Sequence, residues 1–284
     1  MDELTEKLER AWTVRRANFP DEVTWSYPLD TAVLSLTGTQ CALNCAHCGG
    51  HYLLGMKPIW EVEPNESTSC LISGGCDPLG RVPVLAHPDQ VRAWRQGRSM
   101  NWHVGFVSEA EMAAIAPLVD VVSFDFVGDD ATIHEVYGLN RSVDDYIQTY
   151  QILRRHARTL PHVTIGLRGG ELGHELRAFE HLQRLGVDGL VLLVLIPTPG
   201  TRYADRQPPP VSAVVDLIAE ARLRFPETTL YLGCMRPKGR YREELDPLAI
   251  RAGVNVMVSP SRAARKMADD LGLTVHQMRE CCVL

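Results

Sequence analysis

Three cysteines stand within eight residues, at Cys41, Cys45 and Cys48, in the spacing C-x3-C-x2-C. Thiolates are the ligands of iron–sulfur clusters and of zinc, and one short loop can bring three of them to one face of a four-iron cubane. Three ligands would leave one iron open to bind a substrate or cofactor. The alternative is a structural zinc ion with His47 or His51 as fourth ligand, although zinc ligands usually come as two pairs. The spacing therefore favours a [4Fe–4S] cluster.

Five further cysteines are spread along the chain, at Cys70, Cys76, Cys234, Cys281 and Cys282. Without a secretory signal, so many cysteines are better explained as metal ligands or catalytic groups than as disulfides. Cys70 lies in an apolar run, where packing as a small apolar residue explains it as well as ligation does. Packing is a poorer account of a cysteine in a Gly-rich turn or of a pair near the chain end. A second iron–sulfur cluster explains these residues economically.

Charge and hydropathy exclude several classes of function. The 284 residues carry a net charge of −6, which gives no general attraction to nucleic acid or to an anionic membrane. The first residues are charged and lack the apolar core of a secretory signal. No apolar stretch approaches the ~18 residues that cross a bilayer. We therefore expect a cytoplasmic protein without nucleic-acid or membrane partners.

The elements that must position these cysteines alternate between two types. Eight apolar, β-branched runs indicate buried strands at Ala32–Thr37, Ser69–Ser73, Asn101–Val107, Val121–Phe126, Val163–Arg168, Gly189–Ile196, Thr229–Cys234 and Asn255–Val258. Segments of helical period separate most of them, at Pro88–Arg95, Glu109–Leu118, Val143–Arg155, His174–Leu185, Val211–Arg224 and Glu243–Ala252, with a last helix at Ser261–Leu271. This alternation predicts parallel strands joined by helical crossovers.

Eight such units predict an α/β fold, a (β/α)8 TIM-type barrel that is complete or partly open. We expect one domain over residues 1–284, with an N-terminal helical extension (1–30) and a cysteine-bearing tail (272–284). Chemistry in this architecture sits at the C-terminal ends of the strands, and the unusual residues cluster there. The tail cysteines are expected to fold over the same mouth.

The cysteine loop resembles the defining motif of the radical S-adenosylmethionine (SAM) superfamily, including His47, an aromatic-type residue just before the last cysteine. The resemblance implies that the open iron binds the amino and carboxylate groups of SAM. The reduced cluster then cleaves SAM to a 5′-deoxyadenosyl radical, which abstracts a hydrogen atom from the substrate. Cys41, Cys45 and Cys48 are therefore the expected catalytic cluster ligands.

The resemblance extends to the SAM-binding segments. Ser73–Asp77 stands in the place of the family's Gly-Gly-Glu turn, so Gly74 and Gly75 are expected to contact SAM, although a cysteine replaces the glutamate. Ile165–Glu171 loosely matches the adenine-binding segment, and Arg168 is placed to meet the SAM carboxylate with its bidentate fork. An arginine exposed in a polar surface loop is an equally good explanation of Arg168.

Other polar residues fall on the predicted strands. Ser123 and Asp125 lie two apart, so they share one strand face, and Asp125 is expected to bind the SAM ribose or amine. A hydrogen-bonded carboxylate in the barrel is nearly as good an explanation. His103 is expected to be a satisfied core histidine rather than a ligand. Arg236 and Arg240 are expected to neutralise cluster charge or hold a substrate carbonyl.

Within the superfamily, Ile196–Thr201 and Gly233–Pro260 resemble the biotin synthase and hydrogenase-maturase branch. His47–Leu53, Ser73–Asp77 and Gly233–Pro237 are similar to the archaeal-type lipoyl synthases, which work as two related radical SAM proteins. That resemblance implies a sulfurtransferase acting on unactivated C–H carbons of a protein-bound octanoyl chain. It also implies a paired radical SAM protein, a lipoyl-carrier protein or octanoyl-lysine peptide as substrate, and an electron donor such as ferredoxin or flavodoxin.

Lipoyl synthases sacrifice an auxiliary [4Fe–4S] cluster as the source of sulfur. By that resemblance its ligands here are Cys70, Cys76, Cys234 and one of Cys281 and Cys282, with the choice between the last two left open. Two other functions remain possible on the sequence alone. One is cofactor maturation without sulfur insertion, and the other is a non-catalytic iron–sulfur or zinc scaffold.

Overall fold

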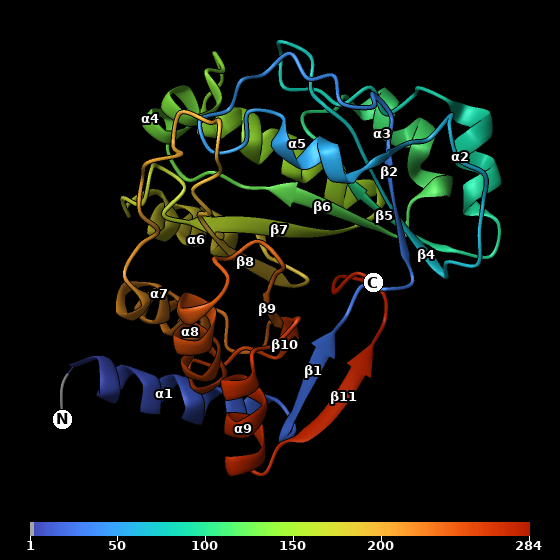
Figure 1. The fold of residues 1–284 in the computed structure, drawn as a ribbon. Helices are drawn as coiled ribbons and strands as arrows, with labels where there is room; N and C mark the ends of the chain where they lie inside the picture. Colours follow the sequence, from blue (N-terminus) through green and yellow to red (C-terminus); the bar gives the residue numbers. More distant parts are fainter. Residues whose placement is uncertain (1–2) are drawn as a thin grey trace.

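A computed structural model describes residues 3–284, and Figure 1 shows a curved sheet with helices packed along its outer side. The sheet has eleven strands in the order β11-β1-β10-β9-β8-β7-β6-β5-β4-β2-β3, and all neighbours pair in parallel. Among the described residues the two outermost strands, β11 and β3, do not pair with each other. The fold is therefore a partly open TIM-type barrel, as predicted.

The strands are β1 (Glu22–Ser26), β2 (Thr31–Ser35), β3 (Lys57–Pro58), β4 (Ser69–Ser73), β5 (Ser99–His103), β6 (Val121–Asp125), β7 (Arg158–Ile165), β8 (Leu190–Val194), β9 (Leu230–Leu232), β10 (Val256–Val258) and β11 (Thr274–Met278). Each of the eight predicted runs overlaps a strand. Strands β1, β3 and β11 are additions. Strand β11 is exposed along nearly its whole length, β3 has two residues, and β1 is largely buried but has only Val23 and Trp25 as apolar residues. Exposed or very short strands carry no apolar run that sequence could reveal.

The helices are α1 (Glu3–Asn18), α2 (Pro88–Arg95), α3 (Glu109–Ile115), α4 (Asp130–Thr132), α5 (Val143–His156), α6 (His174–Leu185), α7 (Val211–Arg224), α8 (Arg240–Arg251) and α9 (Arg262–Asp270). Three short turns of other helix types are η1 (His51–Gly55), η2 (Ala116–Leu118) and η3 (Ile133–Tyr137). Helices α2, α6 and α7 have the predicted bounds. Within residues 3–284, no helix combines the length and the apolar character that a membrane crossing requires.

The two faces of the sheet are buried in two separate apolar clusters. Outward side chains such as Met100 and Trp102 belong to the large core between sheet and helices. Inward side chains, among them Val121, Leu160 and Val191, form a separate cluster on the concave face. Since neighbouring residues of a strand point to opposite faces, this parity decides which polar residues can reach the barrel interior.

The C-terminal tail enters the barrel from the end opposite to the expected mouth. Arg279 pairs with Asp30 just before β2, at 2.7 and 2.9 Å, and Glu280 accepts a hydrogen bond from Thr68 just before β4, at 2.8 Å. Arg158, the first residue of β7, donates to the Val283 carbonyl at 2.9 Å. These contacts lie at the N-terminal ends of parallel strands, so the prediction that the tail folds over the C-terminal mouth is wrong.

Candidate active site

The three-cysteine loop follows β2 directly and is held by backbone contacts. Thr37 donates through Oγ1 to the Gln40 carbonyl at 2.9 Å and accepts from the Gly75 N–H at 2.7 Å. The Ala46 N–H donates to the Val136 carbonyl at 2.7 Å, and Cys48 N–H to the Cys45 carbonyl at 3.1 Å. The loop is therefore anchored to the turn after β4 and to η3.

The loop thiols lie close enough for their charges to interact. Burial, together with Cys48, Cys41 and Cys76, raises the pKa of the Cys45 thiol well above its ordinary value. All four are free cysteines that are partly accessible to solvent. A set of thiols that repel one another as thiolates fits a site that takes cationic iron. Within residues 3–284, no three His, Cys, Asp or Glu side chains are gathered as a site for a single metal ion.

The turn after β4 passes against this loop at van der Waals distance. A β-carbon at Gly75 would lie 2.0 Å from the Gln40 carbonyl oxygen and 2.6 Å from the Cys41 β-carbon, so only glycine fits. The Cys76 N–H donates to the Cys41 sulfur at 3.4 Å. Burial and the nearby Cys41 raise the pKa of Cys76 to about 12. The structure thus places Cys76 with Cys41, Cys45 and Cys48, in what we call the motif group.

His47 and Arg168 flank the motif group in different ways. His47 is partly exposed, its ring meets Tyr137 edge-on with centroids 5.6 Å apart, and its buried Nδ1 has no hydrogen-bond partner in the described chain. Burial lowers its pKa to about 4, so the ring is neutral at pH 7. Arg168, on the loop after β7, is partly exposed and pairs with Glu135 of η3. A SAM carboxylate at Arg168 would have to compete with Glu135.

A polar layer crosses the barrel interior below the motif group. His103 Nε2 of β5 lies 3.5 Å from Asp125 Oδ1 of β6, and the His103 and His162 ring centroids are 5.7 Å apart. Burial alone would raise the pKa of Asp125, but His103, His162 and His47 outweigh it and lower the pKa to about 2. His103, predicted to be a core histidine, therefore lies beside a carboxylate, although its Nε2 makes no hydrogen bond in the described chain.

A cavity of about 140 Å³ lies between this layer and the motif group. Cys76, His103, Asp125, Tyr137 and Tyr146 contribute to its walls. Ordinary ligand pockets measure roughly 300–1,000 Å³, so this cavity takes only part of a ligand. Asp125 thus faces the space beside the cysteine loop.

The tail brings two more cysteines into the barrel interior. The Asn101 amide donates to the Cys281 sulfur at 3.3 Å, and the Cys281 N–H donates to Thr31 Oγ1 at 2.9 Å. A hydrogen bond from Cys282, with help from Val283 N–H and Asn101, lowers the pKa of Cys281 to about 6. Cys234, on the loop after β9, is exposed to solvent, and Cys281 is near enough to affect its pKa. We call Cys234, Cys281 and Cys282 the tail group.

The structure does not bring Cys70 to either group. Cys70 is fully buried on the outward face of β4, in the core between sheet and helices, and burial raises its pKa to about 11. Its neighbours on β4, Ser69 and Leu71, point to the opposite face of the sheet. Cys70 therefore packs as a small apolar residue and does not lie where it could be a cluster ligand, contrary to what the resemblance implied. The expected grouping of Cys76 with the tail cysteines is likewise replaced by contact with Cys41.

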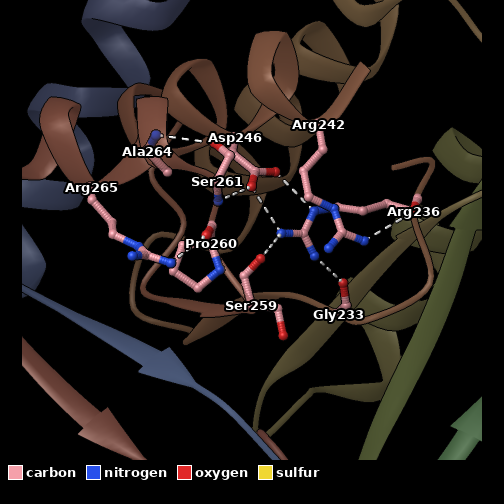
Figure 2. Close-up of polar contacts among 9 residues, drawn as sticks. All are labelled: Gly233, Arg236, Arg242, Asp246, Ser259, Pro260, Ser261, Ala264 and Arg265. Carbon is pink, nitrogen blue, oxygen red and sulfur yellow. Dashed lines mark hydrogen bonds and ion pairs between the residues drawn. The ribbon is translucent and has the colours of Figure 1, made fainter. Parts of the chain in front are cut away.

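The loop that carries Cys234 is fixed by a buried ion pair, shown in Figure 2. Arg236 Nε and Nη2 donate to the two carboxylate oxygens of Asp246 on α8, at 2.8 and 3.0 Å, and both side chains are fully buried. Arg236 Nη1 also donates to the Gly233 carbonyl at 2.7 Å, and Asp246 accepts from the Ser261 N–H at 2.9 Å. Figure 2 shows the carboxylate joining the loop after β9 to the start of α9.

This network gives Arg236 a different role from the one expected. All three nitrogens of its guanidinium donate within the protein and the side chain is fully buried, so it is directed at neither a cluster nor a substrate carbonyl. Asp246, Asn101 and Thr31 are site-positioning residues that sequence reasoning missed. Asn101 had a detectable signal, because it lies two residues before His103 and shares its face of β5.

The fold is shared with enzymes of known structure. Methylornithine synthase (PylB) matches with a TM-score of 0.69 at 14% identity, over 97% of this chain and 90% of that one. HydG, a maturase of the [FeFe]-hydrogenase, matches with a TM-score of 0.70 at 14% identity, over 97% and 69%. SuiB of Streptococcus suis, solved bound to S-adenosylmethionine, matches with a TM-score of 0.55 at 13% identity, over 82% and 58%.

No family model matches the sequence, and no curated protein matches it by sequence. At 13–14% identity the structural likeness establishes the fold.

Proposed function

We propose that the protein is a radical SAM enzyme. The observation that carries this proposal is the C-x3-C-x2-C loop at the C-terminal end of β2, pressed against the Gly75 turn within a partly open parallel barrel. Active sites of such barrels lie at this end. The fold it shares with SuiB, a SAM-bound protein of known structure, gives independent support.

The donor set fits the cofactors this function requires. Cys41, Cys45 and Cys48 would hold a [4Fe–4S] cluster, which when reduced supplies the electron that cleaves bound SAM to a 5′-deoxyadenosyl radical. Gly74 and Gly75 offer backbone groups beside that loop. The buried, unpartnered Nδ1 of His47 and the carboxylate of Asp125 face the same region as polar partners for SAM.

We further propose a sulfurtransferase that acts on a protein-bound octanoyl chain, as one component of a lipoyl synthase. The support is a second set of thiols, the tail group, of which Cys281 lies near His103. Cys234 and one of Cys281 and Cys282 would contribute two of the ligands of an auxiliary cluster that supplies sulfide. The substrate carbon would then lie between the two groups, inside a barrel whose walls exclude water.

Two other components belong to this proposal. The octanoyl chain would arrive on a lipoyl-carrier protein or octanoyl-lysine peptide, and a paired radical SAM protein would supply the second sulfur. A ferredoxin or flavodoxin would supply electrons. Cofactor maturation without sulfur insertion is the second candidate function, favoured by the structural likeness to HydG, a hydrogenase maturase.

The test uses anaerobically reconstituted, reduced protein with SAM and an octanoyl-lysine peptide. We expect 5′-deoxyadenosine and a thiolated peptide, both detected by mass spectrometry. Cys45→Ala should abolish both products, whereas Cys234→Ala should stop thiolation and keep some SAM cleavage. SAM cleavage with no thiolated product under any condition would reject the sulfurtransferase and leave the maturation function.

A further inference from the structure

The backbone of Cys76 is tied to the three-cysteine loop on both of its sides. The Cys76 N–H donates to the Cys41 sulfur at 3.4 Å, and the Cys76 carbonyl accepts from the Ala42 N–H at 2.8 Å. One residue earlier, the Gly75 N–H donates to Thr37 Oγ1 at 2.7 Å. A β-carbon at Gly75 would lie only 2.7 Å from the Cys41 α-carbon, so the two segments are in direct contact. The backbone therefore fixes where the Cys76 thiol begins.

The Cys76 side chain faces the space between the cysteine loop and the ends of β5 and β6. It is part of the wall of the 140 Å³ cavity, together with Leu43 of the loop and Asp125 of β6. A β-carbon at Gly105, just after β5, would lie 3.5 Å from the Cys76 sulfur, so glycine leaves room for the thiol there. Cys76 is also partly accessible to solvent. A group that enters this space from the loop can therefore reach the sulfur.

The thiol of Cys76 is close enough to the other three thiols of the motif group for their charges to interact. Burial raises the pKa of Cys76 to about 12, and Cys41 and Cys48 contribute to the rise. Cys76 contributes in the same way to the raised pKa of Cys45. Bound iron removes this repulsion, because each thiolate then shares its charge with a cation. Four thiolates also complete the ligand set of a [4Fe–4S] cluster, one for each iron.

We propose that Cys76 binds the fourth iron of the cluster held by Cys41, Cys45 and Cys48 as long as SAM is absent, and that SAM displaces it. This inference rests on the proposed function. In the exchange Cys76 gives up its bond to iron, and the amino nitrogen and carboxylate oxygen of SAM bind that iron instead. The released thiolate takes up a proton from water, and no electron is transferred. Cys76 thereby keeps the fourth iron from other ligands until SAM arrives.

The experiment compares the EPR spectrum of the reduced, anaerobically reconstituted full-length protein with that of Cys76→Ala, each before and after SAM is added. Without SAM we expect the two spectra to differ, because in Cys76→Ala the fourth iron binds solvent in place of a thiolate. With SAM they should coincide, since SAM holds that iron in both proteins. Cys70→Ala, which removes the buried thiol of β4, is the matched control and should have the parent's spectrum in both conditions.

The affinity for SAM gives a second measurement, by calorimetry on the reconstituted proteins without reductant. In the parent SAM competes with Cys76, so the apparent dissociation constant is the intrinsic one divided by the fraction of protein in which the iron is open. If that fraction is about one tenth, Cys76→Ala should bind SAM about tenfold more tightly. Cys76→Ser keeps a weaker oxygen ligand, so its affinity should lie between those of the parent and Cys76→Ala.

The outcomes separate this inference from the proposed function. A parent without any SAM-responsive cluster would remove the radical SAM function, and the role of Cys76 with it. A SAM-responsive parent whose spectrum and SAM affinity are unchanged in Cys76→Ala would overturn the role of Cys76 alone. Weaker SAM binding in Cys76→Ala would also overturn it, because Cys76 would then hold SAM and not compete with it. Should the alanine variant assemble no cluster, Cys76→Ser decides, and a parent-like spectrum without SAM would overturn the ligation.

Discussion

Replacing Asp246 by alanine should destabilise the protein far more than an ordinary substitution on a helix. Asp246 and Arg236 are both fully buried, and their two hydrogen bonds of 2.8 and 3.0 Å form a bidentate pair. Asp246→Ala leaves a buried guanidinium whose remaining acceptors are the carbonyls of Gly233, at 2.7 Å, and Ser259, at 3.4 Å. It also leaves the buried Ser261 N–H without its acceptor.

The magnitude follows from these two losses. Removing one partner of a buried ion pair costs about 3–5 kcal/mol, because the other charge stays buried and uncompensated. An unsatisfied buried N–H costs about 1–3 kcal/mol. Since one carboxylate serves both partners, we expect a total loss of at least about 4 kcal/mol. That is a large part of the roughly 5–15 kcal/mol that stabilises a folded protein.

Urea unfolding monitored by circular dichroism measures this loss. The matched control is Glu244→Ala on the same helix, which removes the exposed pair Arg240–Glu244 and should cost only about 0.3–0.5 kcal/mol. The double variant Arg236→Met/Asp246→Leu removes both charges and should recover most of the stability. If Asp246→Ala and Glu244→Ala lowered the free energy of unfolding equally, the buried pair would not have the role assigned to it.

Three further predictions concern the motif group and its surroundings. Gly75→Ala would put a β-carbon 2.0 Å from the Gln40 carbonyl oxygen, so the iron content after reconstitution should fall; normal iron would contradict this close approach. Arg168→Ala should weaken SAM binding in calorimetry, and unchanged affinity would count against its contact with the carboxylate. The pKa of Asp125 is lowered to about 2. The ionised carboxylate therefore contributes its full share to the free energy of unfolding above about pH 4, and this share is lost as the pH falls through 2. The stability difference between the parent and Asp125→Asn should shrink over that range, and a constant difference would refute the charge pairing.

The strands buried on both faces could be predicted from the sequence because each is a continuous apolar run. Strand β11 could not, since almost every residue of Thr274–Met278 is exposed. The path of the tail depends on contacts such as Arg279–Asp30, which join residues 249 positions apart. No local pattern encodes a contact of that range.

The candidate site was predicted in part for a similar reason. The spacing of Cys41, Cys45 and Cys48 is local, so their common loop could be predicted from the sequence. The resemblance to lipoyl synthases implied grouping Cys70 and Cys76 with the tail cysteines. Strand parity turns Cys70 outward, and the close passage of the turn after β4 brings Cys76 to Cys41. Both outcomes depend on the register of neighbouring strands, which the sequence does not state.

The most direct test of the central claim is the EPR spectrum of the reduced, reconstituted protein before and after SAM is added. The account predicts a [4Fe–4S] signal that changes on adding SAM, because SAM would bind the iron that Cys41, Cys45 and Cys48 leave open. Cys45→Ala should lose this SAM-responsive signal. Stoichiometric zinc without iron, or a cluster signal that SAM leaves unchanged, would contradict the claim.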